Sequence, residues 1–148
     1  MSVDPAPSCS EADRVVEVRE LEQLLRDSSA SLFTRYRAMF SLRNRGGEEA
    51  ALALASGFKE EGNALFKHEV AYVLGQVQHP AAVPALVAIL SDLKEHPMVR
   101  HEAAEALGAI GGLEAGRVLE EFRQDKSPAV KESCEVALDT MDYWSVRA

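Results

Sequence analysis

The chain has 148 residues, of which 47% are hydrophobic, and it carries a formal net charge of −8. This length predicts one folded domain with a modest core, and no apolar run approaches the roughly 20 residues that span a bilayer. The acidic balance argues against a nucleic-acid partner, because such binding depends on clusters of lysine and arginine. It suits a cationic partner or substrate, although many proteins are acidic without one.

In chain order, residues 1–29 are predicted to be a flexible tail or linker and a lead-in helix, and residues 30–148 a repeat domain. Prolines and serines without periodicity predict flexibility over residues 1–12, and apolar residues at helical spacing predict a helix over 13–26. Proline and serine at helix starts and glycine at helix ends divide the rest into helices. These cover residues 30–44, 48–57, 64–77, 81–93, 97–110, 113–124 and 128–142. No segment alternates for long enough to be a strand, so the predicted fold class is all-α.

A period of about 33 residues recurs along this helical region. The two clearest frames are residues 66–76 and 99–109, and diverged copies occur at residues 36–42 and 130–138. Helix pairs at this period predict an α-solenoid of about four HEAT-like helical hairpins.

Two apolar positions are shared by the clearest frames. Leu74 aligns with Leu107, which predicts a repeated core position, and Gly75 aligns with Gly108. Glycine inside a helix costs about 1 kcal/mol against alanine. Its repetition at one position therefore predicts a close approach between neighbouring helices.

Each of these frames also carries the dipeptide His-Glu, as His68-Glu69 and as His101-Glu102. Because stacked repeats place equivalent residues side by side, both pairs are predicted to face one groove. Two histidines and one carboxylate form the ligand set of non-haem Fe(II) enzymes. His68, His101 and Glu102 would make one such set, and Glu69 would be left to reach a second metal or a cationic substrate.

Other metal motifs do not fit the sequence. The zincin motif His-Glu-x-x-His has Tyr72 and Glu105 where the second histidine is needed, and the di-iron motif Glu-x-x-His has Leu65 and Met98 where glutamate is needed. The remaining histidines each precede a proline and are expected at turns rather than on a metal. They are His79 and His96. A duplication also copies surface residues that have no role, and this simpler interpretation of the His-Glu pairs stays open.

The repeated frames resemble deoxyhypusine hydroxylase, a family with a HEAT-repeat fold in two symmetric halves and two His-Glu pairs in each half. The resemblance covers roughly residues 30–142 and is carried by three stretches. These are residues 35–44, 66–76 and 97–111. Since this chain has two pairs rather than four, it resembles the C-terminal half alone, with residues 1–29 similar to the linker between halves.

The resemblance implies an iron-dependent monooxygenase half that hydroxylates deoxyhypusine on a basic translation initiation factor to form hypusine. The complete enzyme holds two Fe²⁺ ions between its halves, so the implied partner is the missing N-terminal half or a second copy. Carried over, His68, Glu69, His101 and Glu102 are metal ligands, with Glu69 directed at the partner iron. Glu69 is also expected to meet the polyamine substrate arm. Glu105 lies one helical turn from His101 and is therefore expected to orient a ligand or to meet an amine of this arm.

Two other interpretations remain. The first is a HEAT-repeat protein-interaction module with a vestigial metal site, which bound iron would distinguish from the enzyme. The second, more distant, is a HEAT protein similar to bilin lyases, which would bind a tetrapyrrole. The absence of signal-peptide features and of a disulfide framework predicts a cytoplasmic protein in each case.

Overall fold

The computed structural model describes residues 11–60 and 63–147, and every regular element within them is helical. The tail predicted over residues 1–12 therefore falls almost entirely outside the described part. The elements are α1 (Glu11–Arg26), α2 (Leu32–Arg45), α3 (Gly47–Ala55), η1 (Ser56–Lys59), α4 (Ala64–Val77), η2 (Pro80–Ala82), α5 (Val83–Ser91), α6 (Pro97–Ile110), α7 (Leu113–Phe122) and α8 (Pro128–Arg147).

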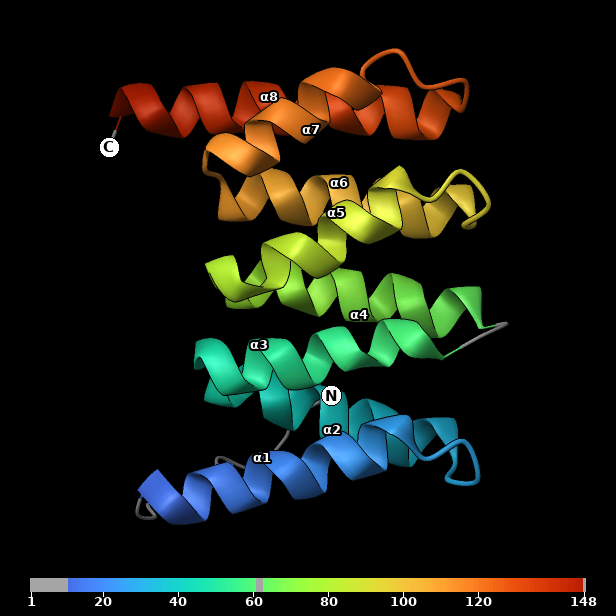
Figure 1. The fold of residues 1–148 in the computed structure, drawn as a ribbon, viewed down its shortest axis with the longest axis vertical. Coiled ribbons are helices and arrows are strands. Elements are labelled where there is room, and N and C mark those ends of the chain that lie inside the picture. Colours follow the sequence, from blue (N-terminus) through green and yellow to red (C-terminus); the bar gives the residue numbers. More distant parts are fainter. Residues whose placement is uncertain (1–10, 61–62, 148) are drawn as a thin grey trace.

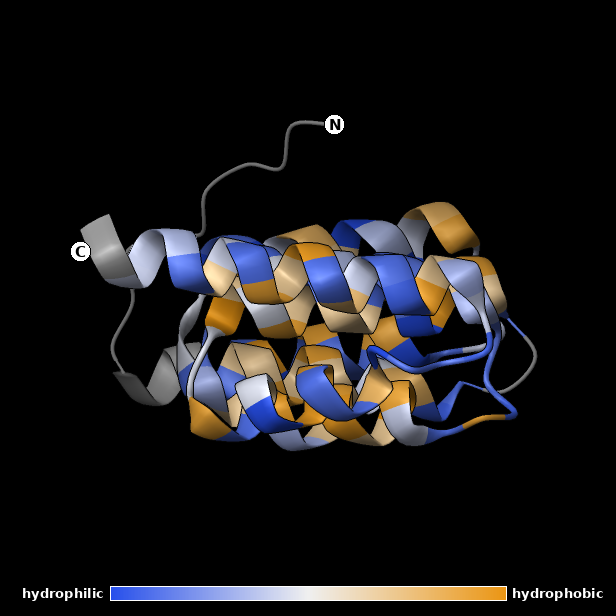
Figure 2. Cartoon of the chain, turned by 90° about the horizontal axis from the view of Figure 1, so that it is seen from above, coloured by the Kyte–Doolittle hydropathy of each residue, from blue (hydrophilic) through white to orange (hydrophobic). Residues whose placement is uncertain are grey.

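The helices pair into hairpins that stack in chain order along the long axis of the molecule (Figure 1). One layer holds α2, α4, α6 and α8, each packed on the next, and the other holds α1, α3, α5 and α7. Viewed from above, the stack is two helices deep (Figure 2). The predicted all-α solenoid of helical hairpins is confirmed.

Helix boundaries agree best where the sequence supplies a cap. Helices α4 and α6 span the predicted residues 64–77 and 97–110. The helix predicted over residues 81–93 is wrong in detail, because η2 precedes α5 and α5 ends at Ser91. Pro84 lacks an N–H and falls in the first turn of α5, while Asp92 accepts a hydrogen bond from the N–H of Lys94 and competes with helix continuation.

Other boundaries differ from the predicted ones by one to five residues. The α-helix predicted over residues 48–57 ends at Ala55, where η1 takes over, and the one predicted over 113–124 ends at Phe122. Helix α8 continues past the predicted end at residue 142 to Arg147, since no glycine or proline follows to stop it.

The core lies between the two layers and repeats with the sequence. Leu42, Leu74 and Leu107 are fully buried, so the predicted core position of the last two is confirmed. Helix α1, expected as a lead-in helix, packs on α2 and α3 and buries Leu25 completely. Cys134 is buried as expected, and burial raises the pKa of its thiol to about 11, which keeps it protonated and unreactive.

Basic residues recur in the first turns of α2, α4 and α6, beside the loops that precede these helices. We call this end of the stack the loop end. Arg35 Nε donates to the carbonyl of Leu25, and Arg100 Nε donates to the carbonyl of Leu90, both at 2.9 Å. Lys67 forms a 2.7 Å ion pair with Glu95. The loop end of the stack is thus held by buried charge-assisted hydrogen bonds. Among the described residues, no helix has the length and apolar character needed to cross a bilayer.

Candidate metal centre

Helices α4 and α6 begin in the same way, and this places their His-Glu pairs at the same height. The side chains of Asn63 and His96 each accept a hydrogen bond from a backbone N–H of the first turn, at 2.9 and 3.1 Å. Side-chain caps of this kind fix where a helix starts. Each His-Glu pair therefore occupies the fifth and sixth residues of its helix. His79 caps η2 in a similar way, so both remaining histidines lie at turns, as predicted.

Two glycines set the register between the helices. A Cβ added at Gly75 of α4 would lie 3.2 Å from the Cα of Ala106 on α6. A Cβ added at Gly108 of α6 would lie only 2.7 Å from the Cβ of Ala137 on α8. The second separation is shorter than any side chain tolerates, so glycine is required there. The close helix approach predicted from the repeated glycines is confirmed.

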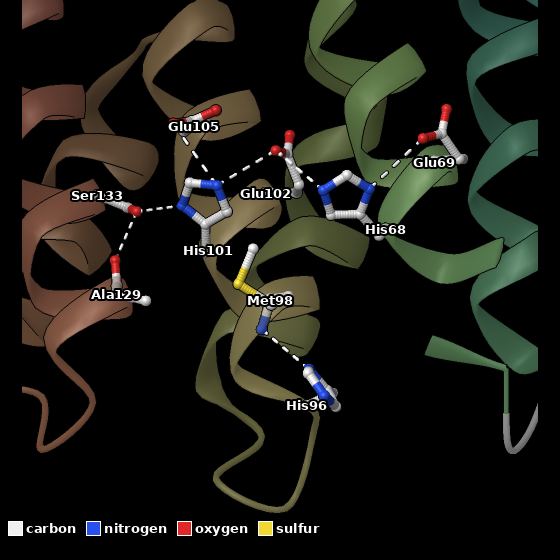
Figure 3. A network of polar contacts seen from close by, with 9 residues as sticks. All are labelled: His68, Glu69, His96, Met98, His101, Glu102, Glu105, Ala129 and Ser133. Atoms are coloured by element: carbon white, nitrogen blue, oxygen red, sulfur yellow. Dashed lines mark hydrogen bonds and ion pairs between the residues drawn. The ribbon is translucent and has the colours of Figure 1, made fainter. Parts of the chain in front are cut away.

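The two histidines converge on one carboxylate oxygen (Figure 3). Nε2 of His68 lies 3.2 Å from Oε1 of Glu102, and Nε2 of His101 lies 3.3 Å from the same oxygen. The residues come from α4 and α6, and both rings are directed at Glu102 from opposite sides. The structure therefore brings together His68, His101 and Glu102, the three residues predicted as one ligand set.

The other two glutamates lie on either side of this group. Oε1 of Glu105 is 3.8 Å from Nε2 of His101, one helical turn further along α6. Oε1 of Glu69 is 3.5 Å from Nδ1 of His68, on the side away from Glu102. The imidazole ring of His68 thus separates Glu69 from the shared oxygen (Figure 3).

Glu102 is the most buried carboxylate of the group, with 8% of the residue exposed. Burial raises the pKa of its carboxyl above the ordinary value, and the neighbouring Glu105 carboxylate raises it further. The two imidazoles lower the pKa, but they do not offset the first two effects. A cation bound at this oxygen would stabilise the carboxylate that burial and Glu105 disfavour.

The donor set fits a divalent metal. One ligand atom from each of His101, Glu102 and Glu105 lies within 4.8 Å of the other two. Nε2 of His68 adds an imidazole nitrogen at the same carboxylate oxygen. Two imidazoles with carboxylates suit Fe(II), and also zinc and related first-row metals. Glu105, which sequence reasoning assigned to substrate, is therefore also within reach of a metal held here.

Sequence reasoning missed two residues that flank the His-Glu residues, one on α8 and one on α2. Ser133 on α8 meets the ring of His101 through an Nδ1···Oγ hydrogen bond. Tyr36 on α2 has a buried hydroxyl with no hydrogen-bond partner among the described residues. Burial, followed by the Glu69 carboxylate, raises the pKa of Tyr36. Both residues belong to the diverged repeat copies, where the absence of His-Glu hid them.

Comparison with known proteins extends these observations. Residues 53–139 match the family model described as HEAT repeats. The chain belongs to the HEAT-repeat family. The matched stretch of HEAT repeats contains both His-Glu pairs and Ser133.

Curated relatives of this HEAT-repeat chain are named deoxyhypusine hydroxylase. The Mus musculus protein is 57% identical over 145 residues, which are 98% of this chain and 46% of the relative. The Candida albicans protein is 51% identical over 142 residues, covering 96% of this chain and 44% of the relative. The resemblance predicted from the His-Glu frames is confirmed, and the chain spans about half the length of these enzymes.

A solved structure gives the same result. The structure of human deoxyhypusine hydroxylase in complex with glycerol matches with a TM-score of 0.85 at 53% sequence identity. The match covers 95% of this chain and 46% of that chain. The HEAT-repeat stack described above is therefore the architecture of about half of that protein.

Proposed function

We propose that this chain is one half of an iron-dependent deoxyhypusine hydroxylase that acts in the cytoplasm on a translation initiation factor precursor. The observation that carries the proposal is the position of Glu102, whose desolvated carboxylate lies between two imidazole nitrogens at 3.2 and 3.3 Å. Similarity to relatives named deoxyhypusine hydroxylase supplies the reaction.

Three side chains would hold one Fe²⁺ ion. His68 and His101 would bind through Nε2 and Glu102 through its carboxylate, which is the ligand set of many non-haem Fe(II) enzymes. The bound iron would supply the activation of O₂ that hydroxylation requires. The protein's own part is to hold these three donors on two helices whose register is fixed by Gly75, so that little reorganisation accompanies metal binding.

The substrate arm is expected to meet the carboxylates on either side of the metal ligands. A deoxyhypusine side chain is a cationic polyamine. The side chain of Glu105 is 48% exposed and that of Glu69 is 26% exposed, so both remain accessible. With the chain's net charge of −8, these carboxylates would attract and orient the ammonium groups, while the buried Glu102 remains with the metal.

A second half is needed to complete the enzyme. Three ligands serve one iron, and Glu69 is left pointing away from it. Two apolar side chains of the same face, Tyr72 and Met98, are 48% and 46% exposed, which suits a surface that another protein covers. The partner would be the part of the relatives that this chain does not span, or a second copy related by a two-fold axis.

The test is hydroxylation of a deoxyhypusine-containing peptide, followed by mass spectrometry. The Fe²⁺-loaded chain is assayed over a wide concentration range, and again with the uncovered part of the mouse relative added. We expect no turnover by the dilute monomer. Activity should appear either at high concentration or on addition of the missing part, and it should be lost in His68→Ala and His101→Ala.

Two outcomes would contradict the proposal. Turnover by a demonstrated monomer would show that one half suffices. Failure to bind Fe²⁺, together with no turnover in either pairing, would favour the alternative of a HEAT-repeat interaction module with a vestigial metal site.

A further inference from the structure

The ring of His101 is held at both of its nitrogens, and only one of these contacts belongs to the proposed iron site. Nε2 faces Glu102, whereas Nδ1 contacts Oγ of Ser133 on α8 (Figure 3). Ser133 is 5% exposed, so this hydroxyl has exchanged water for protein partners. The contact lies on the side of the ring away from the carboxylates.

The direction of the hydrogen bonds follows from the second contact of the serine. Ser133 Oγ lies 2.6 Å from the carbonyl oxygen of Ala129, to which it must donate because a carbonyl only accepts. A hydroxyl has one proton, so toward His101 the same oxygen acts as an acceptor. Nδ1 of His101 therefore carries a ring proton, which leaves Nε2, facing Glu102, as the nitrogen that a metal would bind.

The packing register shows why a serine reaches this position. Gly75 contacts Ala106 and Gly108 contacts Ala137 in the same way, so Ala106 and Ala137 are equivalent in the stack. Four residues before these alanines stand Glu102 and Ser133. The last repeat thus places a hydroxyl where the preceding repeat places its metal-binding carboxylate.

The other histidine lacks such an anchor. Nδ1 of His68 is buried and forms no hydrogen bond with any described residue; the nearest acidic atom is Oε1 of Glu69 at 3.5 Å. The two rings therefore differ although their repeats are alike. One ring is oriented by a neutral hydroxyl that is itself bonded to the backbone, and the other lies between two carboxylates.

We propose, resting on the iron site proposed above, that Ser133 is a positioning residue that fixes the tautomer and orientation of His101 for metal binding through Nε2. Metal-bound histidines generally donate their second ring N–H to a fixed acceptor, and loss of that acceptor weakens metal binding about 10- to 100-fold. Ser133 supplies this acceptor from the terminal helix without contacting the metal.

The first test needs no metal. Long-range ¹H–¹⁵N correlation spectra distinguish the two tautomers of a histidine ring. In the metal-free protein Nδ1 of His101 should carry a proton, and in Ser133→Ala the share of rings with a proton at Nδ1 should fall. His68 serves as an internal reference, because its ring does not contact Ser133 and its signals should be the same in both proteins.

The second test is anaerobic titration with Fe²⁺, repeated with Co²⁺ as a spectroscopic probe. Ser133→Ala should weaken binding about 10- to 100-fold, and Ser133→Thr, which keeps the hydroxyl, should retain most of the affinity. Thr140→Ala is the matched control. Thr140 lies on the same helix and donates to the carbonyl of Val136 at 2.9 Å, the same bond four residues back, but it is exposed to solvent.

The results separate this role from the iron site itself. If the wild type binds metal and His101→Ala loses it, but Ser133→Ala binds with unchanged affinity, the positioning role is overturned and the iron site stands. An unchanged His101 tautomer in Ser133→Ala overturns it as well. If the wild type binds neither metal, the proposed function fails first, and the role of Ser133 fails with it.

Discussion

Arg100 and Glu102 are two residues apart on α6, yet their surroundings are opposite in character. Arg100 donates to the carbonyl of Leu90 at 2.9 Å and to both oxygens of Asp125 at 3.1 and 2.6 Å. The bonds from Arg100 hold the pKa of Asp125 below its ordinary value. Glu102 pairs with no arginine or lysine among the described residues, and burial and Glu105 raise its pKa.

The difference separates a region built for stability from one built for a ligand. At the loop end, buried charges are paired within the chain, as Lys67 and Glu95 also are. On the His-Glu face, the carboxylates of Glu69, Glu102 and Glu105 form no ion pair with a lysine or arginine in the part of the chain that the structure describes. A buried carboxylate whose pKa is raised in this way is typical of binding sites, where a ligand completes the arrangement.

The largest effect is expected from the core that supports both regions. Leu107 is fully buried, and Leu107→Ala should lower the free energy of unfolding by about 2–5 kcal/mol, because it removes apolar contacts and leaves a cavity. Leu113→Ala is the matched control, since Leu113 is 91% exposed and surface changes usually stay within about 0.5 kcal/mol. Urea unfolding measures both, and equal midpoints would show that the core face is misassigned.

Breaking the loop-end ion pair should come next. Arg100→Met leaves Asp125 buried without its guanidinium, and loss of one partner of a buried pair costs about 3–5 kcal/mol. A loss of stability near the lower end of this range is expected, because the N–H of Ser127 still donates to Asp125 at 2.9 Å. The control is Arg123→Met, whose exposed pair with Glu120 should contribute less than about 1 kcal/mol. Similar losses in the two variants would contradict a structural role for Arg100.

The same pair should give the protein an acid-sensitive contribution to stability. The pKa of Asp125 is lowered in the folded chain, first by the side-chain bond from Arg100. Because the pKa of Asp125 is lower in the folded than in the unfolded chain, its ionised carboxylate stabilises the fold at pH values above the unfolded pKa. This stabilisation is lost as the pH falls through the folded pKa. The stability difference between wild type and Asp125→Asn should therefore shrink between neutral pH and pH values below 3.8. A stability difference that grows on acidification would show that ionised Asp125 does not stabilise the fold.

The smallest change in stability, and one of opposite sign, is expected on the His-Glu face. In the metal-free protein Glu102→Gln removes a charge that burial and Glu105 disfavour, while keeping the side chain's shape. Its free energy of unfolding should rise by up to about 1 kcal/mol at neutral pH, as happens when function costs stability. Asp125→Asn measured in parallel should be destabilised. A loss of stability in both variants would mean that Glu102 also serves the fold.

The sequence predicted most of this arrangement, and the gaps have physical causes. The predicted bounds of α6 were correct because Pro97 marks its start, and those of α4 because a glycine separates it from the preceding helix. Repetition of His-Glu was enough to predict that His68 and His101 share one face. Ser133 escaped because packing aligns it with Glu102 through Ala137, whereas a strict period of 33 residues aligns Glu135 with Glu102. The bond from Arg100 to Asp125 escaped because periodicity locates apolar faces and says nothing about which charges pair across loops.

The most direct test of the contrast between these regions is metal-dependent stability. Fe²⁺ is added anaerobically, and unfolding is followed in the wild type, in Glu102→Gln and in Asp125→Asn. A ligand that binds only the folded chain stabilises it by about 2.7 kcal/mol at 100 times its Kd. We predict that this gain appears in the wild type, persists in Asp125→Asn on its lower baseline, and disappears in Glu102→Gln. An equal gain in both variants, or none in the wild type, would contradict the assignment of the His-Glu face as the metal site.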